Sequence, residues 1–171
     1  MSRHRGCYGG QISTYSTVMH EMLPKISLRP AFISDAQFVD DLTRRVMWEY
    51  VCKTWPNAND IEEYFKENSF TLHGTRIILL DSTRIGRITI NEDIYCIYIK
   101  EFHICQEYQS KGIGRFLLDN ILLDAINNDK AVKLTVLKTN PAQRLYKLCG
   151  FTTYKETKER LYMEICNAAT K

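Results

Sequence analysis

The stretch Gln109-Ser110-Lys111-Gly112-Ile113-Gly114-Arg115 has the composition of a phosphate-binding turn. It directly follows a predicted strand and opens a predicted helix. Its two glycines let the backbone approach a ligand closely, and the free N–H groups at a helix start attract anions. Lys111 and Arg115 would add positive charge. The stretch is neither a P-loop, because no G-K-[S/T] is present, nor a dinucleotide-binding fingerprint, because the third glycine is missing. For these residues alone, an ordinary tight turn before a helix is an equally good interpretation.

A second motif lies one predicted strand downstream, between Leu134 and Phe151. It contains Asn140-Pro141-Ala142, then Leu145-Tyr146, then Gly150-Phe151. Together the two stretches resemble the GNAT N-acetyltransferase superfamily. In that family Q/R-x-x-G-x-G/A follows the fourth strand, and a strand, an Asn, a short helix with a Tyr, and Gly-Phe come after it. The resemblance covers about residues 26 to 166, and the segment from Trp48 to Trp55 is similar to that of small, poorly characterised bacterial members.

The resemblance implies a fold and a co-substrate. The expected fold is α/β, with a mixed, mostly antiparallel central sheet flanked by helices, in which the splayed fourth and fifth strands form an acetyl-CoA cleft. It implies that the pyrophosphate sits on the loop from Gln109 to Gly114 and that pantetheine runs along the fourth strand. Asn140 matches a position that helps to hold the cofactor, and Tyr146 a position close to its sulfur. The expected cofactor-binding residues are Phe102, Ile104, Gln109, Ser110, Lys111, Gly112, Ile113, Gly114, Arg115, Asn140 and Tyr146.

The implied reaction is transfer of an acetyl group from acetyl-CoA to a primary amine, by direct attack in a ternary complex. A lysine-like amine has a pKa of about 10.4 and must be neutral to attack, so a general base is useful. We favour Glu101 as the base, with His103 second. Family members often carry an acid at the position that matches Glu101 or at the one before it, where this chain departs from the pattern with Lys100. A backbone N–H near Ile104 would meet the negative charge on the thioester oxygen. Tyr146 would give a proton to the departing thiolate.

Each of these side chains also has a purely structural interpretation. Glu101 would pair with Lys100 or Arg87, His103 would be a hydrogen-bonded histidine near the sheet core, and Tyr146 would be a packed aromatic. The non-catalytic alternative for the whole protein is a GNAT-fold module that binds CoA or a protein partner.

The predicted strand around Glu101 places its side chains on two faces. On an unbroken strand Glu101 and His103 share one face, while Tyr98, Lys100 and Phe102 share the other. A β-bulge in this strand would re-aim either set.

The acceptor is expected to contact the first two helices and the loops beside them. The candidates are aromatic (Trp48, Tyr50, Trp55 and Tyr64), and Glu49, Tyr50 and Trp55 are the predicted substrate-binding residues. Trp55 precedes Pro56 in a helix break, and Glu49 would attract a cationic amine. A small amine and a peptide amine are equally compatible with these residues.

Hydrophobic periodicity predicts the elements that must position these residues. Ser34, with Gln37, is the expected cap of a first helix through Tyr50, and Asn59, with Glu62, of a second helix to about Asn68. The later helices are expected over 112–127 and 141–149. The expected strands cover 25–29, 76–80, 84–91, 94–105, 131–137, 151–154 and 160–165.

Composition restricts the classes of protein that fit. A chain of 171 residues, 44% hydrophobic and 25% charged, is a single globular domain, with residues 1–25 expected to be a loose arm and residues 26–171 the N-acetyltransferase domain. A net charge of +3 disfavours nucleic acid as a partner. No apolar run is long enough to cross a membrane, and the N-terminus lacks the apolar core of a secretory signal, so we expect a cytoplasmic protein without a membrane partner.

Cysteine and histidine spacing gives no metal site, because no C-x-x-C pair is present and the four histidines are scattered. The six cysteines are expected to be reduced, and Cys105 and Cys149 to pack as small hydrophobes rather than carry an acyl group. The final strand, which precedes Cys166, is expected at a sheet edge, where a homodimer could form.

Overall fold

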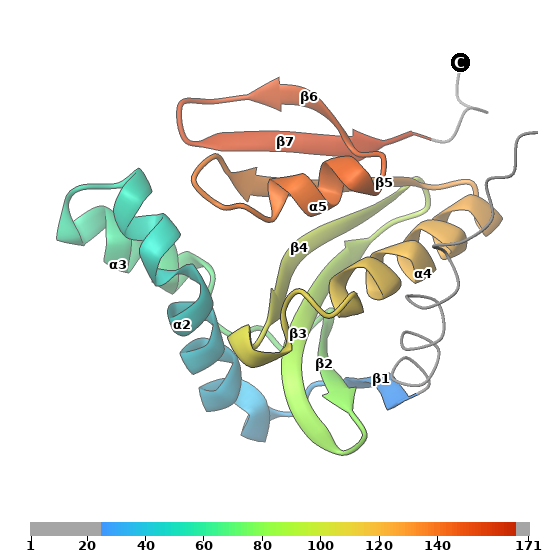
Figure 1. Ribbon diagram of the computed structural model, residues 1–171, viewed down its shortest axis with the longest axis horizontal. Helices are drawn as coiled ribbons and strands as arrows, with labels where there is room; N and C mark the ends of the chain where they lie inside the picture. Colours follow the sequence, from blue (N-terminus) through green and yellow to red (C-terminus); the bar gives the residue numbers. More distant parts are fainter. Residues whose placement is uncertain (1–24, 167–171) are drawn as a thin grey trace, which may run out of the picture.

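The structure is a computed structural model that describes residues 25–166 (Figure 1). Its strands are β1 (Ile26–Pro30), β2 (Thr75–Leu80), β3 (Thr83–Glu92), β4 (Cys96–Ile104), β5 (Ala131–Leu137), β6 (Thr152–Glu156) and β7 (Arg160–Ile165). Its α-helices are α2 (Ala36–Thr54), α3 (Ala58–Glu67), α4 (Ile113–Asn127) and α5 (Gln143–Leu148), and two 3₁₀ turns are η2 (Ile33–Asp35) and η3 (Gln106–Tyr108). The predicted order of strands and α-helices is confirmed.

The strands form one open sheet in the order β1-β2-β3-β4-β5-β7-β6. The β4–β5 pair is parallel and the other five pairs are antiparallel. This confirms the expected mixed, mostly antiparallel α/β sheet.

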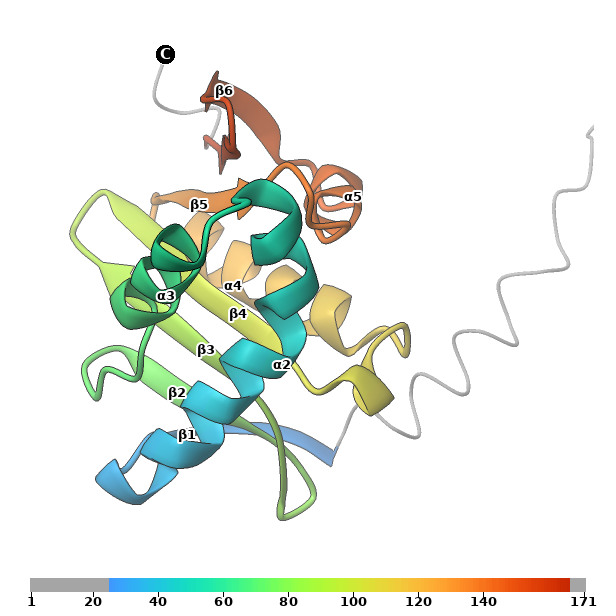
Figure 2. The same ribbon diagram turned by 90° about the vertical axis from the view of Figure 1, so that its left-hand side faces the viewer.

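Helices cover both faces of the sheet. Figure 2 shows α2 and α3 in front of the strands and α4 behind them. On the α4 face, Leu118 of α4 and Tyr146 of α5 pack with Ile88 and Ile99 in the largest hydrophobic cluster. On the opposite face, residues of α2 and α3 form a smaller cluster that reaches Leu137 of β5. The sheet therefore holds α2 and α4 on opposite sides of the same strands.

The two central strands separate near their carboxyl ends. Pairing between β4 and β5 stops at Ile99 and Leu134, although the strands continue to Ile104 and Leu137. The expected splayed strand pair is confirmed. Because the ladder stops, backbone groups at the end of β4 on the β5 side have no strand partner.

A β-bulge at Lys100 changes which side chains of β4 share a face. Thr89 pairs with Glu101, whereas Ile90 pairs with Ile99, so Lys100 has no partner of its own. Phe102 consequently packs in the same cluster as Ile99, and Glu101 faces away from that cluster. The grouping of Tyr98, Lys100 and Phe102 that we expected for an unbroken strand is therefore wrong. The β-bulge that we expected to re-aim these side chains is present.

Helix starts differ from the expected caps. Asp35, not Ser34, precedes α2, and its carboxylate accepts from Phe32 N at 2.9 Å. Asn57, not Asn59, caps α3, because its side chain accepts from Asp60 N at 2.8 Å. Asp, Asn and Ser are similarly favoured at helix N-termini, so residue type alone does not identify which of several nearby candidates precedes the helix.

The last strand is not an edge strand. β7 lies between β5 and β6, and the sheet ends at β6 on one side and β1 on the other. The expected edge for a homodimer at the final strand is therefore wrong. The prediction of a loose arm over residues 1–25 falls outside the described residues, apart from Lys25. Within residues 25–166, no helix is long and apolar enough to cross a bilayer.

Candidate active site

Two cavities meet where β4 and β5 separate. The α4 cavity, of about 360 Å³, lies beside the turn before α4, the first residues of α4, and α5. The bulge cavity, of about 370 Å³, is lined by the bulged part of β4, by β5, and by residues at the end of α3 and the start of β7. The residues that line both are Met47, Phe102, His103, Asn140 and Tyr146. The two cavities are therefore adjacent, with these five residues at their boundary.

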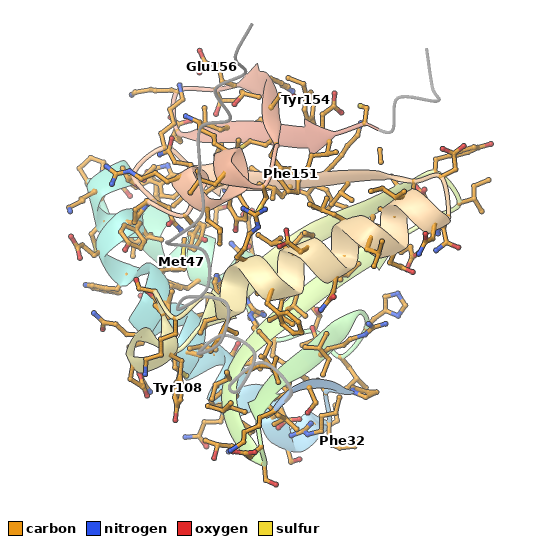
Figure 3. The ribbon with its side chains drawn as sticks, turned by 45° about the vertical axis from the view of Figure 1, so that its right-hand side comes forward. Phe32, Met47, Tyr108, Phe151, Tyr154 and Glu156 are labelled. Atoms are coloured by element: carbon orange, nitrogen blue, oxygen red, sulfur yellow. The ribbon has the colours of Figure 1, made fainter. Side chains whose placement is uncertain are left out.

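Most of the predicted cofactor-binding residues line the α4 cavity: Phe102, Ile104, Gln109, Ser110, Gly112, Gly114, Arg115, Asn140 and Tyr146. Figure 3 labels two further lining residues, Met47 on α2 and Tyr108 on the turn before α4. Lys111 lies outside the lining, with its ammonium 5.4 Å from the centre of the Tyr108 ring. Ile113 is buried in the core beneath the turn.

The start of α4 fits an anionic ligand. Gly112 precedes the helix with φ 78° and offers no side chain to cap it. At the start of the helix Phe116 N donates to Gly112 O at 3.0 Å, and no side chain caps the helix N-terminus. A Cβ added to Gly114 would lie 3.1 Å from Leu145 Cδ2, so the second glycine keeps this wall of the cavity open. Together these features suit a pyrophosphate at a helix N-terminus.

The end of β4 presents backbone groups to the split. Cys105 N donates to Ile85 O at 2.7 Å, toward β3. Because peptide groups alternate in direction along a strand, the N–H and carbonyl of Ile104 point away from β3, toward the α4 cavity. The Gln109 side chain donates to Ile104 O at 2.8 Å, which ties the turn to the strand.

Asn140 and Tyr146 stand at the boundary between the cavities. Asn140 Oδ1 accepts from Ala142 N at 2.9 Å, and this bond orients the amide before α5. Tyr146 is buried, with its ring edge-on to Phe151 at 5.9 Å. Burial, and then the charge of Glu101, raise the pKa of Tyr146 well above its ordinary value. The phenol is therefore protonated at neutral pH and can act as a proton donor.

Glu101 belongs to a buried polar cluster beside the bulge cavity. Its Oε2 lies 3.3 Å from Arg87 Nη2 and 3.3 Å from His103 Nε2. Arg87 Nε donates to His103 Nδ1 at 3.4 Å, so that nitrogen carries no proton and the ring proton sits on Nε2, facing Glu101. The structural alternative, an Arg87–Glu101 ion pair, is thus present, and Glu101 lines the cavity as well.

Protonation in this cluster follows from burial. Burial raises the pKa of Glu101 to about 7, against the opposing charges of Arg87, Lys100 and Arg160. Burial, together with the positive charge of Arg87, holds the pKa of His103 well below its ordinary value. At neutral pH, then, Glu101 can exchange a proton while His103 is neutral and serves as a hydrogen-bond donor.

The predicted substrate-binding residues do not share one cavity. Glu49 is exposed, forms an ion pair with Lys53 and lines neither cavity. Trp55 also lines neither, and the guanidinium of Arg160 lies 5.8 Å from its ring centre. Tyr50 lines the α4 cavity. Substrate contact by these residues stays a prediction.

Sequence reasoning missed several residues that the fold brings to the bulge cavity. Lys100 was expected only as a departure from the family pattern or as a partner of Glu101, not as part of a cavity. Arg160 carried no local signal because it begins a distant strand. Tyr98 and Thr135 share a hydrogen bond of 2.8 Å across the split. The apolar neighbours of Arg87 in β3 were a usable sign that it is buried.

The cysteines lie apart from both cavities. Cys105 is buried and Cys149 half-buried, and burial raises the pKa of each thiol. Neither lines a cavity, which agrees with a packing role. Cys7 lies outside the described residues, and residues 25–166 contain no cluster of side chains that would hold a metal ion.

The sequence of this chain matches one known protein family. The family model described as "Acetyltransferase (GNAT) domain" matches residues 49–167. This chain belongs to the GNAT acetyltransferase family. The match includes the turn before α4, Asn140 and Tyr146, so the GNAT signature and the α4 cavity coincide.

Solved structures share the GNAT fold at low identity. The PaiA N-acetyltransferase from Thermoplasma acidophilum, in complex with coenzyme A, has 20% identity and a TM-score of 0.65, covering 83% of this chain and 99% of its own. The spermidine N-acetyltransferase from Vibrio cholerae, in complex with CoA and spermine, has 21% identity and a TM-score of 0.58, with coverages of 83% and 95%. Arabidopsis thaliana Naa50, in complex with the bisubstrate analogue CoA-Ac-MVNAL, has 17% identity and a TM-score of 0.58, with coverages of 84% and 99%. A search of the curated proteins found no match.

Proposed function

We propose that this GNAT protein transfers an acetyl group from acetyl-CoA to a primary amine by direct attack in a ternary complex. The observation that supports this most strongly is the meeting of the two cavities at Tyr146 and Asn140. Acetyl-CoA would occupy the α4 cavity and supply the activated acyl group. The amine would enter through the bulge cavity. Proteins of the same fold have been solved with coenzyme A, and with CoA and spermine, which supports acetyl-CoA as the co-substrate.

Three groups of the chain would act in the reaction. Glu101, as carboxylate, would take a proton from the incoming ammonium, since it lines the bulge cavity. The N–H of Ile104 would stabilise negative charge that develops on the acyl oxygen. Tyr146 would give its proton to the departing thiolate, because its side chain lines both cavities and its phenol is protonated at neutral pH.

Release of free CoA thiol, measured with a panel of amines beside direct CoA binding, tests the proposal. We expect amine-dependent thiol release, reduced in Tyr146→Phe by about tenfold or more, since general acid catalysis contributes at least that much. Tyr154→Phe, on exposed β6, is the matched control and should behave like the parent. CoA binding without turnover on any amine would favour the non-catalytic module instead.

Nucleic acid, membrane and metal are not part of this proposal. A cytoplasmic location and a homodimer stay predictions made from the sequence.

A further inference from the structure

The bulge cavity carries two cationic side chains that form no ion pair, although their charges act on Glu101. Lys100 and Arg160 both line it, and neither forms an ion pair with any residue of the range 25–166. Cations on neighbouring strand positions are paired: Lys133 Nζ lies 3.2 Å from Glu164 Oε2, and Lys138 Nζ lies 3.2 Å from Glu156 Oε2. The two charges at the cavity are thus available to a ligand.

Arg160 is held in place by contacts that leave its guanidinium edge available. Its backbone N donates to Thr157 Oγ1 at 3.1 Å at the start of β7, and its guanidinium lies 5.8 Å from the centre of the Trp55 ring. A ring face supports a guanidinium without accepting hydrogen bonds along the edge. A planar fork of N–H donors, with an ammonium group lining the same cavity, is suited to a carboxylate.

The two acids that line the cavity form no ion pair with these cations. Glu101 already contacts Arg87 and His103. Glu67, at the end of α3, is exposed to solvent and also lines the cavity. The second ammonium group of a diamine would be repelled by Lys100 and Arg160. In an amine that also carries a carboxylate, the carboxylate would be attracted by these two cations and the amine by Glu101.

We propose that the acceptor is a small amine that also carries a carboxylate. Arg160 and Lys100 bind the carboxylate, and Glu101 faces the amine. The volume of about 370 Å³ is in the range of small-molecule sites. The inference rests on the proposed function in that it takes the bulge cavity as the acceptor site.

Three amines of equal chain length test it: 4-aminobutanoate, butylamine and 1,4-diaminobutane. They carry a negative, neutral or positive group at the end opposite the amine. Calorimetry measures their binding to protein saturated with CoA, and thiol release from acetyl-CoA measures turnover. We expect 4-aminobutanoate to be preferred over each of the others by about tenfold or more, the size expected of a charge-assisted contact.

Variants of Arg160 and Lys100 test whether these two side chains cause the preference for 4-aminobutanoate. Arg160→Gln and Lys100→Gln should each reduce the preference, and Arg160→Glu should shift it toward 1,4-diaminobutane. Arg144→Gln on α5 and Lys155→Gln on β6 remove exposed cations that line neither cavity, and should leave the preference unchanged.

The outcomes separate this inference from the proposed function. No binding of 4-aminobutanoate to the CoA-loaded protein, equal use of the three amines, or preference for the diamine would each overturn the inference. Binding that depends on Arg160, without acetyl transfer to any amine, would support it and overturn the proposed function.

Discussion

Glu101 combines two roles that usually conflict. It is the buried partner of Arg87, and it lines the cavity through which an amine would approach. Burial alone would drive the carboxyl to its neutral form. The surrounding cations Arg87, Lys100 and Arg160 oppose that effect, and the pKa settles at about 7. A base with this pKa matches the pH at which it would work.

The pH dependence of transfer follows from that value. The groups that face Glu101 are Arg87, Lys100, His103 and Arg160, with the protonated phenols Tyr64 and Tyr146 beside them. Because the base acts as carboxylate, kcat/KM should fall as pH is lowered through about 7. Glu101→Gln should lose about 100-fold in kcat/KM at neutral pH, and this limb of the profile should disappear.

The pH profile of thiol release with one amine decides this prediction. The amine itself titrates at about pH 10, well separated from the limb near 7, so the two titrations can be told apart. Glu107→Gln, which removes an exposed carboxylate outside both cavities, is the control. A Glu101→Gln profile that keeps the limb near 7 would assign the base to another group.

Gly114, in the first turn of α4, keeps space in the α4 cavity because it has no side chain. A Cβ on Gly114 would lie 3.1 Å from Leu145 Cδ2, 3.7 Å from Ile104 Cδ1 and 4.0 Å from Phe102 Cε1. All three neighbours line the α4 cavity. Gly114→Val should therefore weaken CoA binding by about tenfold or more, and in the free protein the crowding opposes the gain in helix propensity.

Calorimetric titration with CoA, together with thermal unfolding of the free protein, separates the two effects. Asn120→Val, on the exposed side of the same helix, should leave CoA affinity unchanged. Unchanged affinity in Gly114→Val would place the ligand elsewhere.

The connection from β1 to α2 is held by one carboxylate. Asp35, whose side chain is 2% exposed, lies 2.7 Å from Arg29 Nη1 and 3.1 Å from Arg84 Nη1. Hydrogen bonds from Arg29 are the main reason that the pKa of Asp35 lies well below its ordinary value. Since the folded pKa is below the unfolded one, this carboxylate stabilises the fold above about pH 4 and loses that effect as pH falls.

Asp35→Asn should therefore lower the free energy of unfolding by about 1–3 kcal/mol at pH 7. Its deficit relative to the parent should shrink toward pH 3. Urea unfolding at both pH values measures the change, and Asp41→Asn, an exposed acid on α2, is the control. A deficit that is the same at both pH values would argue against an ionic role.

Local patterns predicted the elements, and the motifs predicted most of the α4 cavity. The helix α4 and the strand β5 follow from periodicity, because each depends on neighbours in the sequence. The bulge at Lys100 carries no glycine or proline to mark it, so the face of Glu101 could not be assigned. The place of Arg160 depends on β7 pairing with β5, which is non-local.

The separation of β4 from β5 divides the sheet into two parts that few backbone bonds join at that end. The α4 cavity lies across this division: Val46 comes from α2, Ile104 from β4, Gly114 from α4 and Leu145 from α5. A ligand that fills it would connect elements on both sides. CoA should therefore raise the free energy of unfolding of the whole domain, whether or not acetyl transfer follows.

The expected size of this effect follows from linkage. Ligand at 100 times its Kd stabilises by about 2.7 kcal/mol, and for a chain of this length that corresponds to a Tm increase of about 5–10 °C. Thermal unfolding over a CoA series measures it. Gly114→Val should need about ten times more CoA for the same increase, because its cavity is narrowed. A Tm that does not respond to CoA, in a protein that is otherwise folded, would mean that the α4 cavity does not bind this ligand.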